Sequence, residues 1–190
     1  PETVTAYELG LKTDLADGIA RLNAAVFYND YSDMQIFTVV SGGGPVAFQV
    51  LDNAANAVTQ GAEVELTALP ARGLNVSLGL AYLDTELKDY RSDSGLDLSG
   101  NSLVQAPEWS ANGMLRYERP VSANLLSSVQ IDFSYQDKVY FTSDNSEPLS
   151  QDAYWLWNAQ VGVESQSGRW HAAVFARNLG SEEYYSHGFN

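Results

Sequence analysis

The sequence predicts an all-β fold, a transmembrane antiparallel β-barrel segment of about eight strands taken from a larger barrel. Three observations predict it. Apolar and polar residues alternate with a period of two along most of the chain. Short turns alternate with long polar segments between the expected strands. Aromatic residues gather near the strand ends that lead into the long segments, as in the aromatic girdles of membrane barrels.

The expected strands share one pattern, in which every second residue is apolar and those between are mostly polar or small. Phe27, on the polar side, is an exception. Most of the strands are long enough to cross a bilayer at a tilt, which takes ~9–11 residues. In chain order their apolar positions are Tyr7, Leu9, Leu11 and Leu15; Leu22, Ala24, Val26 and Tyr28; Ala62, Val64, Leu66 and Ala68; Val76, Leu78, Leu80 and Tyr82; Trp109, Ala111, Leu115 and Tyr117; Val129, Ile131, Phe133 and Tyr135; Trp157, Ala159, Val161 and Val163; and Trp170, Ala172, Val174 and Ala176.

The connections between these strands fall into two classes. The short ones are Ala16–Gly18, Pro70–Gly73, Glu118–Asn124 and Ser165–Arg169. The long ones, expected to be irregular, span residues 36–59, 86–107 and 143–151, and they are rich in Gly, Ser, Asn and Asp. Strict alternation places every long connection at one end of the sheet. Outer-membrane barrels have this arrangement, with long loops outside and short turns on the periplasmic side.

The aromatic residues indicate what the apolar face touches. Those near the long connections are Tyr28, Tyr31, Tyr82, Trp109, Tyr135, Tyr140, Trp155 and Trp157, whereas Tyr117 and Trp170 lie near short turns. Because amphipathic rings collect at both membrane interfaces, we expect the apolar face to point into outer-membrane lipid. The alternative is a soluble all-β sandwich, a binding or structural module with its apolar face turned inward; solubility without detergent distinguishes the two.

Composition excludes several classes of function. The chain has 24 acidic and 10 basic residues, a formal charge of −14, which argues against a nucleic-acid partner. It has no cysteine, so disulfides, thiolate metal sites and cysteine nucleophiles are excluded. No apolar run approaches the ~20 residues of a membrane-spanning helix.

The direction of the strands argues for a slice of a wider barrel. The first expected strand enters a short turn and the last leaves one, so both chain ends are expected on the long-loop side. The polar face also has few bulky side chains, whereas a closed eight-stranded barrel must fill its interior.

Four segments carry a family resemblance: "AYELGLKTDLADGIARLNAAVFYNDYSDMQI", "QGAEVELTALPARGLNVSLGLAYLDTEL", "LSGNSLVQAPEWSANGMLRYE" and "ARNLGSEEYY". In this order they resemble the C-terminal barrel of TonB-dependent outer-membrane receptors. The resemblance implies a 22-stranded barrel with a plugged lumen, located in the outer membrane of a Gram-negative cell. It also implies TonB-dependent uptake of a scarce small molecule, such as a ferric siderophore, haem, cobalamin or a glycan. Residues 1–190 would form part of that barrel, without the N-terminal plug that contacts TonB and without the final strand.

The candidate site residues form two groups. Ligand contacts are expected from loop residues chosen by location alone: Tyr90, Arg91, Tyr140, Phe141 and Asn145. Contacts with the plug or with water are expected from polar residues that face the lumen: Glu63, Glu65, Asn112, Arg116, Gln130, Asp132, Asn158, Gln160 and Arg177.

No catalytic residue, metal ligand or cofactor is assigned. The acidic residues between Asp84 and Asp97 could gather a Ca²⁺ ion, but their spacing does not match an EF-hand loop, and a solvated loop held extended by its charges is the favoured interpretation. A Ser134, Asp132 and His171 constellation would draw on different strands with nothing local to join them. We therefore expect the protein not to be an enzyme.

Overall fold

The computed structural model describes residues 1–41, 47–92 and 95–188, and it contains one large antiparallel sheet. The sheet has eight strands in the order β1-β2-β3-β4-β5-β6-β9-β10. Each strand pairs antiparallel with its neighbour in this order, as the sequence predicts. The bounds are β1 Thr3–Leu15, β2 Ala20–Ser41, β3 Ala47–Ala71, β4 Leu74–Asp89, β5 Trp109–Ser122, β6 Leu125–Gln136, β9 Tyr154–Ser165 and β10 His171–Ala176.

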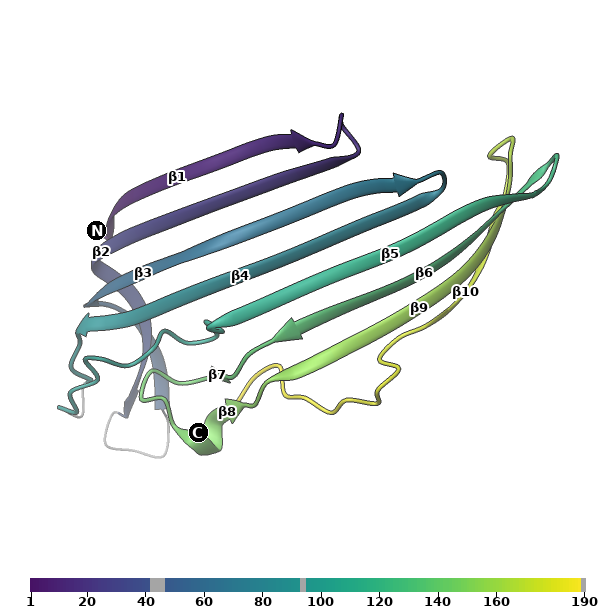
Figure 1. Ribbon diagram of the computed structural model, residues 1–190. Helices are drawn as coiled ribbons and strands as arrows, with labels where there is room; N and C mark the ends of the chain where they lie inside the picture. The colour runs from purple at the N-terminus through teal and green to yellow at the C-terminus, as the bar shows by residue number, and fades with distance from the viewer. Residues whose placement is uncertain (42–46, 93–94, 189–190) are drawn as a thin grey trace.

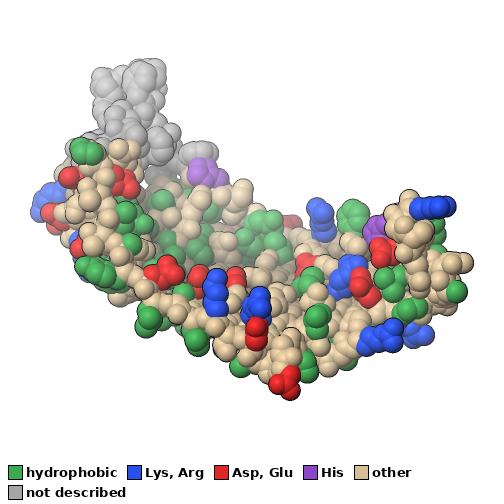
Figure 2. Space-filling view, turned by 90° about the horizontal axis from the view of Figure 1, so that it is seen from above, with side chains coloured by type: hydrophobic (Ala, Val, Ile, Leu, Met, Phe, Trp, Pro, Cys, Tyr) green, Lys and Arg blue, Asp and Glu red, His purple; other side chains and the backbone are tan. Residues whose placement is uncertain are grey.

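The short turns lie at one end of the sheet, and the long connections lie with both chain ends at the other (Figure 1). The connection between β6 and β9 contains β7 Val139–Tyr140, the 3₁₀ turn η1 Glu147–Leu149 and β8 Ser150–Gln151, and β7 pairs with β8. Seen from above, the molecule is a crescent with one hollowed side (Figure 2). Among the described residues, β1 and β10 remain the two edges of an open sheet.

The register places the predicted apolar residues on one face and the predicted polar residues on the other. One apolar row runs Leu11, Ala24, Val64, Leu80, Ala111, Tyr135 and Trp155 across seven strands. The next row lies on the opposite face and runs Lys12, Asn23, Glu65, Gly79, Asn112, Ser134 and Leu156. Directly paired residues share a face, so this register keeps the two sets apart over the whole sheet.

The apolar face is exposed. Leu9 is 74% exposed, Val161 57% and Val174 79%. Within the described part of the chain no second large sheet covers this face, because the other sheet is the two-residue pair β7-β8 in a loop. A sandwich would bury these side chains, so the soluble alternative is not favoured.

Aromatic rings cluster on the apolar face at the long-loop end of the strands. Tyr82 packs on Trp109 with ring centroids 4.9 Å apart, and Tyr135 on Trp155 at 4.7 Å. Phe133 lies 5.0 Å from Trp157 and covers Gly113 directly opposite it; a Cβ at Gly113 would come within 2.4 Å of the Phe133 ring. On the polar face Gly61 makes similar room for Phe27, an aromatic residue out of pattern.

The buried apolar residues lie at the long-loop end, not between two layers. Ala55, Ala57, Leu87, Tyr90 and Leu98 form a cluster, which we call the loop-end core. Ala57 and Leu87 are paired across β3 and β4. Tyr90 and Leu98 come from the connection after β4, so this connection folds back over the extended ends of the strands.

Two predicted connections are more ordered than expected. Residues 36–59 are not an irregular loop, because β2 continues to Ser41 and β3 starts at Ala47, so most of this segment extends the hairpin past a register shift between Tyr31 and Met34. Residues 42–46 lie outside the described part. The connection after β4 is not held extended by its charges: it turns back through Ser92 and Leu96, whose backbones hydrogen-bond at 2.9 Å.

Two further details complete the fold. The last strand, β10, has six residues and is shorter than a full crossing requires. No helix in the described ranges is long and apolar enough to span a membrane.

Candidate functional site

A continuous row of hydrogen-bonded side chains crosses the polar face from β5 to the segment after β10. Arg116 of β5 pairs with Glu118 at 2.6 Å and donates to Gln130 of β6 at 3.3 Å. Gln130 donates to Asp132 at 3.0 Å, and Asn158 of β9 donates to the second oxygen of Asp132 at 2.7 Å. Successive side chains of a strand point to opposite faces of the sheet, so these residues all lie on the polar face, at neighbouring positions.

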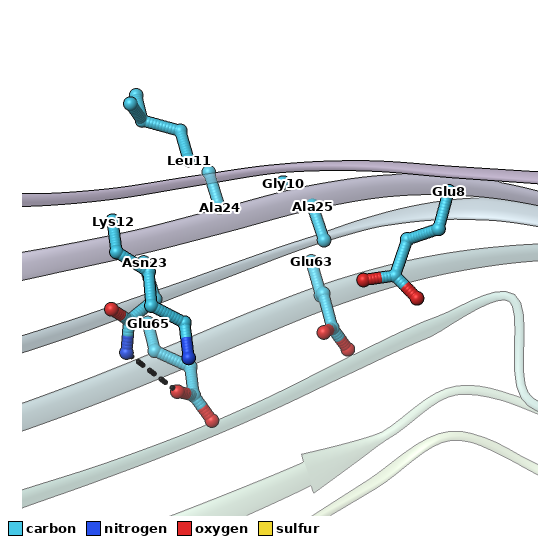
Figure 3. A pocket seen from close by; sticks show the side chains of 9 residues that line it. All are labelled: Glu8, Gly10, Leu11, Lys12, Asn23, Ala24, Ala25, Glu63 and Glu65. Carbon is cyan, nitrogen blue, oxygen red and sulfur yellow. Dashed lines mark hydrogen bonds between the residues drawn. The ribbon is translucent and has the colours of Figure 1, made fainter.

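The other half of the polar face, over β1 to β3, forms a shallow hollow of about 390 Å³ (Figure 3). Glu8, Glu63 and Glu65 supply carboxylates to it, and Lys12 supplies an ammonium group. The hollow between these charged groups stays open at Gly10 and Ala25, because neither residue has a side chain large enough to fill it. In the described residues only Glu65 of these carboxylates has a hydrogen-bond partner, Asn23, at 3.3 Å.

The predicted lumen-facing residues therefore divide into two groups. Arg116, Gln130, Asp132 and Asn158 are joined to one another, and Asn158 also accepts a hydrogen bond from the backbone of Asn178 at 3.0 Å. Glu63 and Glu65 belong to the hollow. The remaining three lie on the same face or beside it: Asn112 against Gly79, Gln160 opposite Gln130, and Arg177 over the Phe175 ring at 5.2 Å.

At the long-loop end, two connections far apart in sequence are bonded to each other. Asn145 donates to the carbonyl of Ser102 at 3.0 Å and accepts from the Ser102 amide at 2.8 Å. Asn101 donates to the carbonyl of Ser143 at 2.9 Å, and the Gln105 amide donates to the carbonyl of Tyr140 at 2.9 Å. The segment 101–105 and the segment 140–145 therefore form one unit, which we call the loop bridge.

The predicted ligand contacts occupy different environments in these loops. Tyr90 is 4% exposed in the loop-end core, so its surroundings favour packing over ligand contact. Asn145 uses its amide in the loop bridge. Arg91 is exposed and pairs with Asp97 at 3.3 Å. Tyr140 donates to Glu147 at 3.3 Å, and the Phe141 ring lies 6.1 Å from that of His187.

Hydrogen bonds lower the pKa of two loop carboxylates, Glu147 and Asp97. The hydrogen bond from Lys138, at 2.5 Å, is the main reason that the pKa of Glu147 is lowered, and the same bond raises the pKa of Lys138. The Ser99 hydroxyl and amide lower the pKa of Asp97. These loop groups are therefore ionised at neutral pH and paired.

The partners in the loop bridge were not predicted from the sequence. Asn101, Ser102 and Gln105 lie some 40 residues from the residues that they contact, and no local motif signals such a pairing. Tyr184, which stacks on Tyr154 at 4.6 Å, was likewise not assigned a contact.

The acidic residues between Asp84 and Asp97 do not gather around one point. Asp84 accepts from Gln60 at 2.8 Å, Glu86 pairs with Lys88, and Asp97 binds Ser99; Asp93 lies outside the described residues. Across the ranges that the structure describes, no group of three or more His, Cys, Asp or Glu side chains could hold a metal ion. Asp132 is hydrogen-bonded to Gln130 and Asn158, and within the same ranges it has no hydrogen bond to Ser134 or His171.

One protein-family model matches residues 1–179; its description is TonB dependent receptor-like, beta-barrel. Solved structures share the fold. The ferric yersiniabactin uptake receptor FyuA from Yersinia pestis matches with a TM-score of 0.80 and 24% identity, over 100% of this chain and 26% of its own. The siderophore receptor PiuA from Acinetobacter baumannii matches with a TM-score of 0.73 and 22% identity, over 97% and 25%.

A third match is BauA, the ferric preacinetobactin receptor from Acinetobacter baumannii, with a TM-score of 0.70 and 19% identity over 95% of this chain and 26% of its own. The chain thus spans about a quarter of the length of these solved structures. At such identities the likeness establishes the fold alone.

Proposed function

The chain belongs to the TonB-dependent receptor β-barrel family, and from this premise we propose that it is a wall segment of an outer-membrane transport receptor. The receptor takes up a scarce ligand, a ferric siderophore or another metal chelate, using energy delivered through TonB. The observation that carries the proposal is the apolar face, which is exposed across the large sheet and bordered by aromatic rings at the loop end. Such a face is stable in a bilayer and costly in water.

The polar face would then line the lumen of the complete barrel. Its two halves suit different contacts. The row from Arg116 to Asn158 is internally bonded, which suits a stiff wall in contact with water. Glu8 and Glu63 have no hydrogen-bond or ion-pair partner among the described residues. We therefore expect a plug domain to place cationic or hydrogen-bond-donating groups over β1 to β3.

The loops would supply the ligand contacts. Of the predicted residues, Arg91, Tyr140 and Phe141 keep enough accessible surface to contact a ligand, whereas Tyr90 and Asn145 support the loops. A chelate entering from the loop side would meet the loop bridge and the aromatic residues near it.

The test uses the complete receptor that contains this chain, expressed in a Gram-negative host. Uptake of ⁵⁵Fe-labelled siderophores is measured in iron-limited cells with and without tonB, alongside outer-membrane fractionation and heat-modifiable migration. We expect a folded outer-membrane barrel and uptake that needs tonB. A protein found in the soluble fraction, or uptake of no metal chelate by a folded barrel, would contradict the proposal at separate steps.

A further inference from the structure

We propose that Arg72, Arg119 and Arg169 form a binding rim for the phosphates of anionic phospholipid headgroups, at the end of the sheet where the short turns lie. We call these three residues the arginine rim. The inference rests on the proposed function, since it requires the sheet to stand in a bilayer. It adds a lipid-binding surface to that function.

The three arginines follow one another along the edge of the molecule. Arg72 lies in the turn between β3 and β4, Arg119 near the end of β5, and Arg169 in the turn before β10. Backbone hydrogen bonds join these turns sideways: Glu118 donates to Gly73 at 2.7 Å, and Gln166 donates to Asn124 at 2.9 Å. The rim is therefore continuous over strands β3 to β10.

All three guanidinium groups are exposed, and none forms an ion pair or a side-chain hydrogen bond with another described residue. The basic residues of the loop end behave differently. Lys88 pairs with Glu86, Arg91 with Asp97 and Lys138 with Glu147. The loop end thus pairs these three cations, and the short-turn end pairs Arg21 with Asp14 but leaves the arginine rim without a partner among the described residues.

Neighbouring aromatic residues indicate the depth of the arginine rim in the bilayer. Arg119 follows Tyr117 by two positions in β5, so both lie on the apolar face, and Trp170 follows Arg169 directly. Tyr117 is 44% exposed and Trp170 48%. Trp and Tyr prefer the headgroup level of a bilayer, so the guanidinium groups lie where lipid phosphates do. This favours lipid over a soluble acidic protein.

The chemistry selects a lipid with net negative charge. A guanidinium group binds a phosphate through two parallel N–H···O bonds, and it keeps its charge at any physiological pH. Phosphatidylglycerol offers a phosphate without a compensating cation, whereas the choline of phosphatidylcholine cancels the charge. Each arginine near an anionic surface is expected to favour the anionic lipid by roughly two- to fivefold.

The test measures lipid preference at the surface of the complete receptor. The protein is reconstituted into phosphatidylcholine vesicles that contain spin-labelled phosphatidylglycerol or spin-labelled phosphatidylcholine, and the motionally restricted fraction of each label is compared. The test variant carries Arg72→Gln, Arg119→Gln and Arg169→Gln. The control carries Arg21→Gln, Lys88→Gln and Lys138→Gln, which removes three cations that are already paired.

We expect the unmodified receptor and the control to prefer phosphatidylglycerol, and the rim variant to lose most of this preference. The preference should also weaken in about 1 M NaCl, where the Debye length is ~3 Å. Equal preference for phosphatidylglycerol in all three proteins, or an equal loss of this preference in both variants, would overturn the proposal that the arginine rim binds lipid. So would loss of uptake with unchanged lipid preference, which would indicate a soluble acidic partner. Heat-modifiable migration and iron uptake are measured on the same samples, so failure of the rim is distinguished from failure of the receptor assignment.

Discussion

The loop bridge depends on Asn145, and replacing this residue should release the two connections from each other. Its side chain makes both a donor and an acceptor bond with the backbone of Ser102, at 3.0 and 2.8 Å. The backbone of Asn145 is left-handed, with φ of 49°. Asn145→Gly is the appropriate change, because glycine adopts positive φ freely and removes only the side-chain bonds.

The size of the effect follows from the two bonds. Each contributes about 1 kcal/mol net, so their loss lowers the free energy of local opening by about 2 kcal/mol. An opening equilibrium changes tenfold for every ~1.4 kcal/mol, so the protection of the Ser102 amide against hydrogen exchange should fall about 30-fold. Protection of the Gln105 amide, bonded to Tyr140 across the same bridge, should fall with it.

The assay is hydrogen exchange followed by mass spectrometry on the complete receptor in detergent micelles. The control is Asp144→Gly, in the same loop, where an exposed side chain with no hydrogen bond to another described residue is replaced. Added backbone freedom costs about 0.4–1 kcal/mol, so this control should lower protection by roughly fivefold at most. If Asn145→Gly lowers protection at Ser102 no more than the control does, the side-chain bonds do not hold the loops together.

Three further changes test the loop-end core, the aromatic cluster and the pH response of the loops. Leu87→Ala, in the loop-end core, should lower the free energy of local opening by about 2–5 kcal/mol, read as faster hydrogen exchange at residues 98–101, whereas Leu96→Ala, at a side chain 55% exposed, should have little effect. Gly113→Ala should destabilise the folded barrel in a heat-modifiability assay, because its Cβ meets the Phe133 ring at 2.4 Å. The double variant with Phe133→Ala should lose less stability than the sum of the losses in the two single variants, and simple additivity would contradict this packing. The pKa of Glu147 is lowered in the folded loop, so its stabilising pairing is fully present above its ordinary value of 4.5 and is lost as the pH falls through the lowered value. Hydrogen exchange at residues 147–149, corrected for the intrinsic pH dependence of exchange, should therefore stay constant from pH 7 to 5. A change above pH 5.5 would refute the pairing.

The sheet was predictable because its signal repeats at every second residue. The apolar sets expected in the eight strands all lie on one face, and the short turns and long connections lie at opposite ends. A one-residue error in register would transfer a whole set to the wrong face, so the pattern specifies pairing strongly. The hairpin extension beyond Tyr31 was missed because the register shift there breaks the period, although "IFTVV" and "VAFQV" flanking "SGGGP" are themselves typical of a hairpin.

The loops were less predictable, for a physical reason. Their contacts join residues some 40 positions apart, and nothing in the sequence shows whether a side chain such as Asn145 makes a structural bond or a ligand contact. Tyr90 illustrates the same difficulty. An aromatic residue in a polar loop can face a ligand or the loop-end core, and only the fold, which places it beside Ala57 and Leu87, separates the two.

Paired and unpaired polar groups are distributed unevenly over the sheet. On the polar face, hydrogen bonds join the side chains of Arg116, Gln130, Asp132 and Asn158 over β5 to β9, whereas Glu8 and Glu63 on β1 and β3 have no partner among the described residues. At the loop end Lys88, Arg91 and Lys138 are paired, whereas at the short-turn end Arg21 is paired with Asp14 and the three residues of the arginine rim are unpaired beside aromatic rings. Free charge costs little where water or a headgroup solvates it and much where it is buried. The arginine rim and the open carboxylates of the hollow therefore each mark a surface that a partner of opposite charge would stabilise, whereas the apolar face needs no polar partner.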